Sequence, residues 1–488
     1  MAIPMTQIPE NLLVPGEYQE IDNSLAGSVG DIKKVLIVGY KLDGAPTPAG
    51  KPIQVLNDIK AAELCGYGSD AAIMAKEFLS INKVEECWIL PLAEPEAGTT
   101  WSVPFTVTVT TAGDGFLEIK INGKVLQAGV AKDADAQAVA AAIAAAINSD
   151  TSLPVEASVS DAVVTVSALM KGYVTDNNTA DITVKASGVS VTKGDVTHGT
   201  GGDYSINISE LFPSISGIRF DYIVSELDAP AHIKNLADEL ESRYKPTRQI
   251  GGRAFVALTG EVGSASEEGT MLEKAEAVNS PHIVLVPRGN NPGLPCVWAA
   301  RFCATACRVL ADDPAANTYD LSVSGLVADS EYNFDVRQKL LEAGIATFRL
   351  DTAGKVLIER LVTSYTENTD GGRDTSYLDI QVTETVDAVR TYINASARKV
   401  FGKWKLSSTN ENFGSGAKVM STGVWRSFLA ELYQDVFIKE KQWCQDFDSY
   451  VRSIIVEIKS GSKTRLEYKH EPNLMGQFYI GAGLLQFK

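Results

Sequence analysis

The sequence lacks long hydrophobic runs and has too little positive charge to balance its acidic residues. No stretch of its 488 residues approaches the roughly 20 apolar residues that a membrane-spanning helix needs, so we expect no membrane insertion. Lys and Arg total 44 against 61 Asp and Glu, which gives a formal net charge of −17. Sequence-independent nucleic-acid binding requires a basic face. We therefore expect no direct nucleic-acid partner.

The four histidines and six cysteines are scattered and form no metal-binding motif. Cys303 and Cys307 lie four residues apart in a predicted helix, and Cys296 is nearby in sequence. No CxxC pair or neighbouring histidine supports a metal site there. We expect small buried thiols in a reducing compartment, and no bound metal.

Motifs for nucleotide binding and catalysis are also missing. Gly44 and the pair Gly50-Lys51 follow a predicted strand, but five residues separate the glycines and Pro52 follows the lysine. A phosphate-binding loop has four residues between its glycines and a hydroxyl residue after the lysine. There is no GxSxG sequence. We therefore predict no enzymatic activity, no catalytic residue and no cofactor.

The first 30 residues have the features of an extended arm. Three prolines break any helix in this segment, and Gly16–Asp22 has the composition of one short strand. The sequence MAIPMTQIPENLLVPG has neither the basic n-region nor the apolar h-region of a secretory signal. We expect a protein that is made and used in the cytoplasm, or released without secretion.

Predicted strands and helices alternate over residues 31–93 and 206–343. In the first segment a right-handed crossover through two helices, the second capped by Asp70, makes the flanking strands parallel. We therefore predict an α/β middle domain around a mostly parallel sheet. The predicted strands are Lys34–Tyr40, Glu86–Leu92, Asp221–Ser225, Ala254–Leu258 and His282–Pro287, with Tyr319–Leu326 a strand or loop, and the predicted helices are Asn57–Cys65, Asp70–Asn82, His232–Tyr244, Val297–Ala311 and Asn333–Ala343.

Residues 94–205 differ sharply in composition, because Thr, Val, Ala and Gly dominate and aromatic residues are few. Asn122-Gly123 is typical of a tight hairpin turn. We predict a self-contained, mostly β outer domain inserted into the middle domain, without catalytic features. Its predicted elements are strands at Val103–Thr110, Phe116–Ile121, Lys124–Val130, Val155–Val159, Val163–Ala168 and Ile182–Lys185 and a helix at Asp133–Asn148.

Residues 344–404 predict a hairpin followed by a long helix. The second strand, Lys355–Thr366, carries apolar residues on both faces, so we expect it to be buried on both sides. Glu359 and Arg360 are adjacent on it and point to opposite faces, which favours structural salt links over acid–base chemistry. Asp374 or Thr375 is the predicted helix cap. The predicted apolar stripe comprises Leu378, Val382, Val386, Val389, Ile393, Val400 and Trp404.

A basic cluster at the end of this helix stands out in an acidic chain. It contains Arg398, Lys399, Lys403 and Lys405. One interpretation is that these cations complement the helix dipole at its C-terminus. The other is a basic patch that contacts an acidic protein partner. The sequence leaves both open.

The last residues predict a helix around Val424–Val436, a short helix carrying Trp443, Phe447 and Tyr450, and a hairpin made of Ser453–Lys459 and Thr464–Lys469. The tail, Gly476–Lys488, is strand-like and apolar on both faces. An apolar terminal strand must pair with a sheet. That sheet belongs either to its own chain or, by strand addition, to a neighbouring subunit.

Several segments together resemble the tail sheath proteins of contractile-tailed, Mu-like bacteriophages. They are IPENLLVPGEY near the start, Asn279–Val286, Gly344–Ile380 and RLEYKHEPNLMGQFYIGAGLLQF at the end. Ser364 stands where the family pattern has threonine, and residues 94–205 are the variable part. The matched positions are Gly354, Lys355, Val356, Glu359, Arg360, Thr363, Tyr365, Gly371, Asp374, Thr375, Ser376, Tyr377, Leu378 and Asp379.

The resemblance implies an assembly function. Sheath subunits stack as hexameric rings in a helical polymer around a tail tube, and contraction drives the tube through the host envelope. The implied partners are further copies of the chain, the tail tube protein, and baseplate and tail terminator proteins. The implied location is the virion tail, assembled in the bacterial host cytoplasm.

The resemblance also implies an architecture: an α/β fold plus an all-β insert, with extended N- and C-terminal strand arms. The N-terminal arm 1–30 joins a core sheath domain, 344–488, which ends in a C-terminal arm at 472–488. Arm residues Tyr18, Ile21, Phe478, Ile480, Leu484 and Phe487 would link subunits. Glu359, Arg360, Tyr365, Asp374, Tyr377 and Asp379 would form the core-domain motif, and Arg398, Lys399, Lys403 and Lys405 a possible tube contact.

Two other interpretations compete with the sheath. An α/β enzyme with a β-sandwich insert requires a ligand cleft with convergent polar groups at the carboxyl ends of the strands. A β-rich surface adhesin is the other, because the insert is rich in strands.

Overall fold

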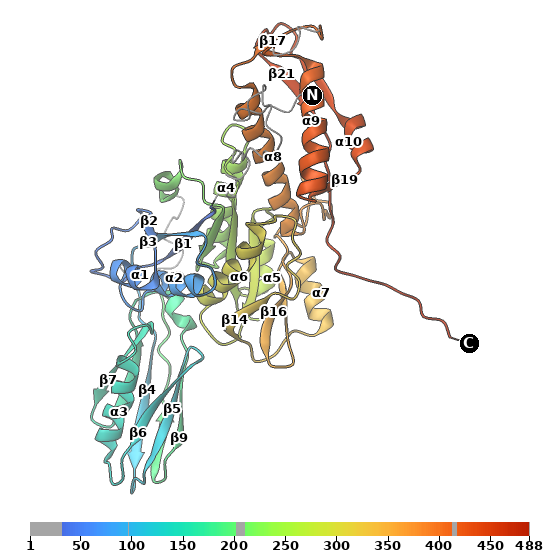
Figure 1. The fold of residues 1–488 in the computed structure, drawn as a ribbon. Helices are drawn as coiled ribbons and strands as arrows, with labels where there is room; N and C mark the ends of the chain where they lie inside the picture. The colour runs from blue at the N-terminus through green and yellow to red at the C-terminus, as the bar shows by residue number, and fades with distance from the viewer. Residues whose placement is uncertain (1–31, 96, 202–209, 412–416, 488) are drawn as a thin grey trace, which may run out of the picture.

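The computed structural model describes residues 32–95, 97–201, 210–411 and 417–487. The chain is a mixed α/β protein with several separate sheets. It is elongated, with the insert at one end and the helices of the last 100 or so residues at the other (Figure 1). None of the helices within these ranges is long and apolar enough to cross a membrane.

The middle of the molecule is a six-stranded sheet in the order β13-β12-β11-β1-β3-β2. All neighbours pair in parallel except β2, which is antiparallel to β3. The predicted parallel sheet is therefore confirmed, and the short edge strand β2 is an addition to it. The strands are β1 (Lys34–Tyr40), β2 (Ile53–Val55), β3 (Glu86–Leu92), β11 (Tyr222–Ser225), β12 (Arg253–Thr259) and β13 (Ile283–Gly289).

Helices cover both faces of this sheet. Alternate residues of β1 point to opposite faces of the sheet. Val35 and Ile37 pack on the face covered by α1, α2 and α6, whereas Leu36 and Val38 pack on the face covered by α4 and α5. Because both faces are buried, the strands are continuously apolar. The helices are α1 (Asp58–Cys65), α2 (Asp70–Ile81), α4 (Pro230–Tyr244), α5 (Met271–Glu276), α6 (Pro295–Leu310) and α7 (Phe334–Glu342), and a 3-10 turn covers Phe212–Ile215.

The cap predicted for α2 was wrong by one residue. Ser69 is the N-cap, and its Oγ accepts a hydrogen bond of 3.2 Å from the backbone N–H of Ala72. Asp70 is the first helical residue and its side chain is buried. Because the Ser69 side chain already accepts a hydrogen bond from a backbone N–H at the start of the helix, the carboxyl group of Asp70 is not needed as a cap and can face the interior.

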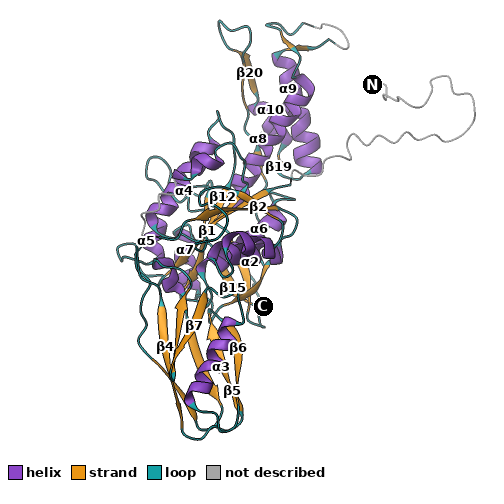
Figure 2. Cartoon of the chain, turned by 90° about the vertical axis from the view of Figure 1, so that its left-hand side faces the viewer, coloured by secondary structure: helices purple, strands orange, loops and turns teal. Residues whose placement is uncertain are grey.

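The insert has a core of its own, formed by two sheets and a helix. One sheet has the order β10-β4-β8-β7 and the other β6-β5-β9. Figure 2 shows β4, β5, β6 and β7 of this insert together with α3. The predicted Asn122-Gly123 turn is confirmed, with φ of 49° and 84°. The predicted mostly β character is confirmed, and the helix predicted at Asp133–Asn148 forms as α3, which packs into this core. The elements are β4 (Ser102–Val109), β5 (Gly115–Ile121), β6 (Lys124–Val130), α3 (Ala136–Asn148), β7 (Val155–Ser160), β8 (Val163–Ala168), a 3-10 turn (Tyr173–Asn177), β9 (Ala180–Lys185) and β10 (Val189–Lys193).

The hairpin predicted after Gly344 forms, but its second strand is shorter than expected. β15 (Thr347–Leu350) and β16 (Lys355–Arg360) pair antiparallel, and β14 (Ser322–Val327) flanks β16. The prediction that the segment Lys355–Thr366 is buried on both sides is confirmed only in part. Within β16, Val356 and Ile358 are fully buried, whereas the alternate residue Leu357 is half-buried. Beyond the strand, Leu361, Val362 and Thr363 are all fully buried, so both alternating positions are covered there.

The long helix also starts later than predicted. α8 (Ile380–Phe401) has Asp379 in the N-cap position, while Asp374 lies in the preceding turn. The predicted apolar stripe was partly wrong: Val389 and Ile393 are buried, but Val400 is 49% exposed. The first half of α8 instead buries polar residues against the sheet, namely Gln381, Thr383, Glu384, Thr385 and Asp387.

The last part of the chain forms a second packed body around α8. Tyr433 and Tyr450 stack in its core with ring centroids 3.5 Å apart. The predicted hairpin is confirmed as β20 and β21, while Trp443 lies before the short helix instead of on it. The elements are β17 (Lys405–Leu406), β18 (Val419–Met420), α9 (Thr422–Glu431), a π-helix (Leu432–Glu440), β19 (Cys444–Gln445), α10 (Phe447–Ser453), β20 (Ile455–Ile458), β21 (Leu466–Lys469) and β22 (Asn473–Leu474).

The packing bears on where the last domain begins. Ile345, Phe348 and Ile380 belong to the cores on either face of the central sheet, whereas Val389 and Ile393 belong to the last body. We therefore propose that the division between middle and last domains lies within α8.

Candidate functional site: a terminal arm, a hairpin edge and the mount of α8

The C-terminal arm begins as an extended segment held against the body. The backbone N–H of Met475 donates to the carbonyl of Trp443 at 2.9 Å, and Gln477 Nε2 donates to the carbonyl of Ala315 at 2.7 Å. The ring of Tyr479 lies 4.8 Å from the Arg360 guanidinium. Gln477 and Tyr479 thus face the body while Phe478 and Ile480 face outwards, which is the period of an extended strand.

Beyond Ile480 the arm leaves the body (Figure 1). Leu484, Leu485 and Phe487 are 85%, 91% and 93% exposed. The predicted arm residues Phe478, Ile480, Leu484 and Phe487 are therefore all exposed in the single chain, where this segment pairs with no described strand. The two N-terminal arm residues of the prediction, Tyr18 and Ile21, lie outside the described residues.

The β20–β21 hairpin offers open sheet edges. Its strands pair only with each other among the described strands, so both outer edges carry free backbone groups. Ile455 and Tyr468 on it are 57% and 39% exposed. Unpaired edges of this kind are templates for strand addition by another chain.

The predicted core-domain motif forms a set of contacts around the loop between β16 and α8. Arg360 binds Asp379 with two hydrogen bonds of 2.8 and 3.1 Å, and Glu359 pairs instead with Arg337 at 3.6 Å. The expectation of separate structural salt links is confirmed.

The same loop is closed by its tyrosines. The Tyr365 hydroxyl donates to Asp374 at 2.8 Å, and its ring meets that of Tyr377 edge to face at 5.4 Å. The Arg360 guanidinium also packs against the ring of Tyr479, so this motif contacts the first part of the C-terminal arm.

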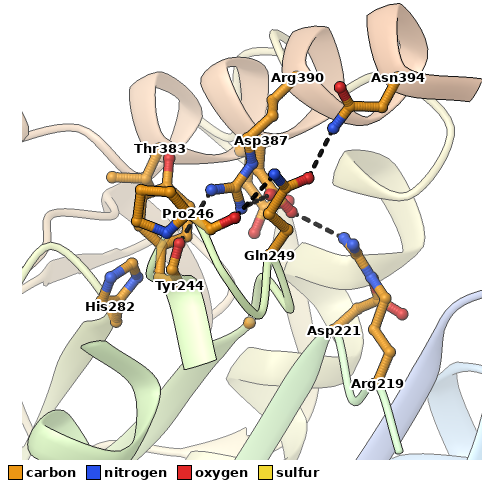
Figure 3. A network of polar contacts seen from close by, with 12 residues as sticks. Arg219, Asp221, Tyr244, Pro246, Gln249, His282, Thr383, Asp387, Arg390 and Asn394 are labelled. Atoms are coloured by element: carbon orange, nitrogen blue, oxygen red, sulfur yellow. Dashed lines mark hydrogen bonds and ion pairs between the residues drawn. The ribbon is translucent and has the colours of Figure 1, made fainter. Parts of the chain in front are cut away.

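A polar network fixes α8 to the central sheet, and Figure 3 shows its members converging. The carboxylate of Asp387 accepts hydrogen bonds from Arg219 at 2.7 Å and from Arg390 at 2.6 Å. Burial opposes ionisation of Asp387, but Arg219, Arg253 and Arg390 outweigh it and hold the pKa of this carboxyl below its ordinary value. The Arg390 guanidinium also lies 4.0 Å from the ring of Tyr244.

This network was not found from the sequence. Its residues on α8 are spaced three apart, at 384, 387 and 390, which is also the pattern of an ordinary solvated helix face. Their partners Arg253, Arg219 and Tyr244 are more than 100 residues away in sequence, and no local signal joins them.

The predicted basic cluster is fully on the surface. Arg398, Lys399, Lys403 and Lys405 are exposed and make no ion pair with any residue in the described ranges. Arg398 and Lys399 lie in the last turn of α8, where the helix dipole favours cations. Lys403 and Lys405 lie beyond the helix, so the dipole does not account for them.

A hollow of about 980 Å³ adjoins this cluster, between the end of α8 and α9. Its lining is mixed: Phe401, Trp404, Val424, Phe428 and Leu432 are apolar, whereas Lys399 is joined by three acidic residues, Glu411, Glu431 and Asp435.

The carboxyl edge of the parallel sheet is where an α/β enzyme would hold its ligand, between β1 and β11. The chain fills this place with its own side chains. Asp70, Glu226 and Cys296 are buried there, with their carboxyl and thiol atoms within 4.8 Å of one another. The backbone N–H of Tyr40 donates to Glu226 at 2.6 Å.

Two buried carboxyl groups this close share a proton unless a cation lies between them. Burial raises the pKa of Asp70 to about 6 and raises that of Glu226 well above its ordinary value. These three residues are chemically able to bind a metal ion, but a shared proton satisfies the same arrangement. The six cysteines are all free and buried, as expected from the sequence.

Comparison with known proteins gives one full-length relative. The chain is 28% identical over 497 aligned positions to the "Mu-like prophage FluMu tail sheath protein" of Haemophilus influenzae, and the alignment covers 100% of both chains. No protein-family model matches the chain.

Solved structures give weaker likenesses. A sheath tail protein from Desulfitobacterium hafniense has a TM-score of 0.48 at 11% identity, with 94% of this chain and 100% of that chain covered. The helical sheath of the anti-feeding prophage in its contracted state has a TM-score of 0.48 at 10% identity, with 97% and 99% covered.

The resemblance predicted from short segments thus extends along the whole molecule: in sequence, from end to end, this chain is similar to a Mu-like prophage tail sheath protein.

Proposed function

We propose that this chain is the structural subunit of a contractile phage tail sheath, with no enzymatic activity. It polymerises helically as stacked hexameric rings around a tail tube, and its contraction drives the tube through the host envelope. The observation that carries the proposal is the similarity of the whole chain to a tail sheath protein. The partners we propose are further copies of the chain, the tube protein, and baseplate and terminator proteins, in the tail of a virion assembled in the host cytoplasm.

The exposed arm supplies a physical reason to polymerise. Seven residues, Gly481–Phe487, reach at most about 25 Å when extended. Burying a Leu or Phe side chain stabilises by about 1.5–3 kcal/mol, so docking Leu484, Leu485 and Phe487 is worth about 5–9 kcal/mol before the ordering cost. We propose that the arm adds a strand to the open β20–β21 edge of a neighbouring copy.

Strand addition suits a polymer that changes shape. Main-chain hydrogen bonds between an arm and an acceptor hairpin move with both elements, so subunits stay linked while their bodies rotate. The extended sheath is then a kinetically trapped state, and outer domains that gain contacts on contraction supply the driving force.

The basic end of α8 is our candidate for the tube contact. Its four cations are exposed and form no ion pair with any described residue, which suits an acidic partner surface; the adjoining hollow carries acidic residues of its own and is not part of this proposed contact. Reversing Lys399 and Lys403 to Glu should weaken binding to the tube protein in co-sedimentation. Undiminished binding by this variant would exclude the cluster as the tube contact.

Electron microscopy of the purified chain tests the assembly. Tubes or stacked rings are expected from the intact chain, whereas discrete monomers at every concentration would contradict the proposed function. Removing residues 481–488 should abolish tubes without unfolding the body, because the body contacts of Met475, Gln477 and Tyr479 remain. The matched control replaces the same residues by a Gly-Ser tail of equal length.

A further inference from the structure

The first part of the C-terminal arm is fixed to the start of α8 through Tyr479. Gln381, in the first turn of α8, donates from its Nε2 to the Tyr479 hydroxyl oxygen at 3.2 Å. The Arg360 guanidinium lies 4.8 Å from the centre of the Tyr479 ring and is itself held by two hydrogen bonds to Asp379. A cation over an aromatic ring is attracted to it, so the ring and the hydroxyl of this tyrosine are both held.

A second contact holds the arm two residues earlier. The Nε2 of Gln477 donates to the carbonyl of Ala315 at 2.7 Å. We call the contacts of Gln477 and Tyr479 with the body the arm clamp. Beyond the clamp the side chains face solvent: Ile480 is 78% exposed and Phe487 is 93% exposed. The free part of the arm therefore begins at Ile480.

The β20–β21 hairpin, which is the proposed acceptor of the arm, lies beside the other end of α8. Phe401 ends this helix, and its ring centre lies 5.9 Å from that of Trp425. The ring centre of Trp425 lies 5.1 Å from that of Tyr468 on β21. Gln381 and Phe401 are 20 residues apart (401 − 381), which is about 30 Å along a helix. Figure 1 shows β21 at the top of the molecule and the arm leaving the body well below it.

The free arm is too short to pair with this hairpin in its own chain. Ile480–Phe487 contains 8 residues, and pairing along β21 uses 4 of them, because β21 is 4 residues long. The other residues reach at most about 14 Å when fully extended. This is about half of the length of α8 that separates the arm clamp from the hairpin. A hairpin on another copy is not subject to this limit, because its distance depends on how the copies pack.

We propose that Tyr479 is a positioning residue, and that the arm clamp holds the exit of the arm so far from its own hairpin that the arm pairs only with another copy. An arm on a long flexible tether would meet its own hairpin at an effective concentration on the order of millimolar. Such closure would occupy the donor strand and the acceptor edge of the same chain and would stop polymerisation. The proposal rests on the strand addition of the proposed function, and it adds the reason why this addition occurs between chains.

Cysteine cross-linking between the arm and the hairpin tests the proposal, because all six native cysteines are buried. A chain carrying both Ile455→Cys and Leu484→Cys should form a ladder of disulfide-linked oligomers on a non-reducing gel after mild oxidation of assembled protein. A mixture of the two single variants should stop at dimers. A monomer closed by an internal disulfide, formed by the double variant at its normal length, would overturn the proposal.

A length series measures the limit that the clamp sets. Ten Gly and Ser residues inserted after Ile480 add up to about 35 Å of reach, so the double-cysteine chain should form closed monomers and lose its ladder and its tubes. The matched control carries the same ten residues after Lys488, where they do not change the reach of Leu484, and it should keep the ladder.

Releasing the clamp should shift this limit. Gln477→Ala combined with Tyr479→Ala frees about four more residues of arm, so closed monomers should appear at an insertion about four residues shorter. A merely structural role of Tyr479 would leave the required insertion length unchanged, and that result would overturn its positioning role.

The failure of this inference can be distinguished from the failure of the proposed function. Tubes from the normal-length chain whose arms do not cross-link between copies at Ile455 would overturn the inference alone. If the normal-length chain gives neither tubes nor a ladder, the proposed function itself fails.

Discussion

The attachment of α8 to the central sheet depends on Asp387, and its removal is expected to be costly. The side chain of Asp387 is 7% exposed, and it pairs with Arg219 and Arg390. Removing one member of a buried ion pair costs about 3–5 kcal/mol, because a charge is left without compensation. Both arginines are partly exposed and keep another partner, Asp221 and the carbonyl of Tyr244 respectively, so we expect Asp387→Ala to cost about 3 kcal/mol.

Gly251 provides a matched variant at the same contact. A Cβ atom there would lie 1.9 Å from an Asp387 carboxylate oxygen and 2.5 Å from its Cγ. Gly251→Ala should therefore destabilise by about 1–3 kcal/mol through overpacking. In the double variant Gly251→Ala/Asp387→Ala the clash is gone, so the combined loss should be smaller than the sum of the two single losses.

The pH dependence gives a second readout of the same group. The pKa of Asp387 is lowered in the folded state, so its stabilisation is present above the unfolded pKa of about 3.9 and is lost as the pH falls through the folded value. Asp387→Asn should therefore lose less stability than the intact chain on acidification below about pH 4. Urea unfolding followed by circular dichroism measures both effects. Additive losses in the double variant, or an unchanged acid profile in Asp387→Asn, would refute the role assigned to this carboxylate.

Three further variants test local features. Burial raises the pKa of Asp70 to about 6, so the folded protein should lose stability as the pH rises from about 4 to 6. Asp70→Asn should make this decline in Tm smaller. An unchanged pH profile would contradict the shared proton. Ser69→Ala removes the N-cap hydrogen bond of α2 and should lower the free energy of unfolding in urea by about 1 kcal/mol. An unchanged free energy of unfolding would show that this hydrogen bond does not stabilise the helix. Gly123→Ala places a side chain at φ 84° and should destabilise only the insert by about 1 kcal/mol, seen as a shift of one thermal transition and not of the others.

Local sequence patterns predicted most elements because each carries its own signal. The continuous apolar strands β1 and β3 could be recognised as buried and parallel, and Asn122-Gly123 defined its hairpin without reference to the rest of the chain. The hairpin β20–β21 was found in the same way. The exposed arm was also visible, since its apolar residues stand where no helix follows to cover them.

What the sequence did not reveal depends on distant partners. Glu384 and Asp387 on α8 are buried where they pair with Arg253, the first residue of β12, and with Arg219, which precedes β11. The predicted apolar stripe of this helix gave no sign of these partners. The short strand β10 is an edge with a mixed pattern, and only its pairing with β4 defines it. The surroundings of Asp70 likewise require Glu226, which lies 156 residues further along the chain (226 − 70).

The manner in which the insert is attached has a consequence for how such chains vary. Its two connecting segments run side by side, with the N–H of Thr99 donating to the carbonyl of Thr200 at 2.8 Å, and its apolar core is separate from the others. Entry and exit points this close together let one module be exchanged for another without altering the spacing of the remaining chain. A replacement module with adjacent termini should therefore be tolerated between residues 99 and 200, provided that it preserves the contacts that Met170, Tyr173 and Val174 make with the core of the middle domain.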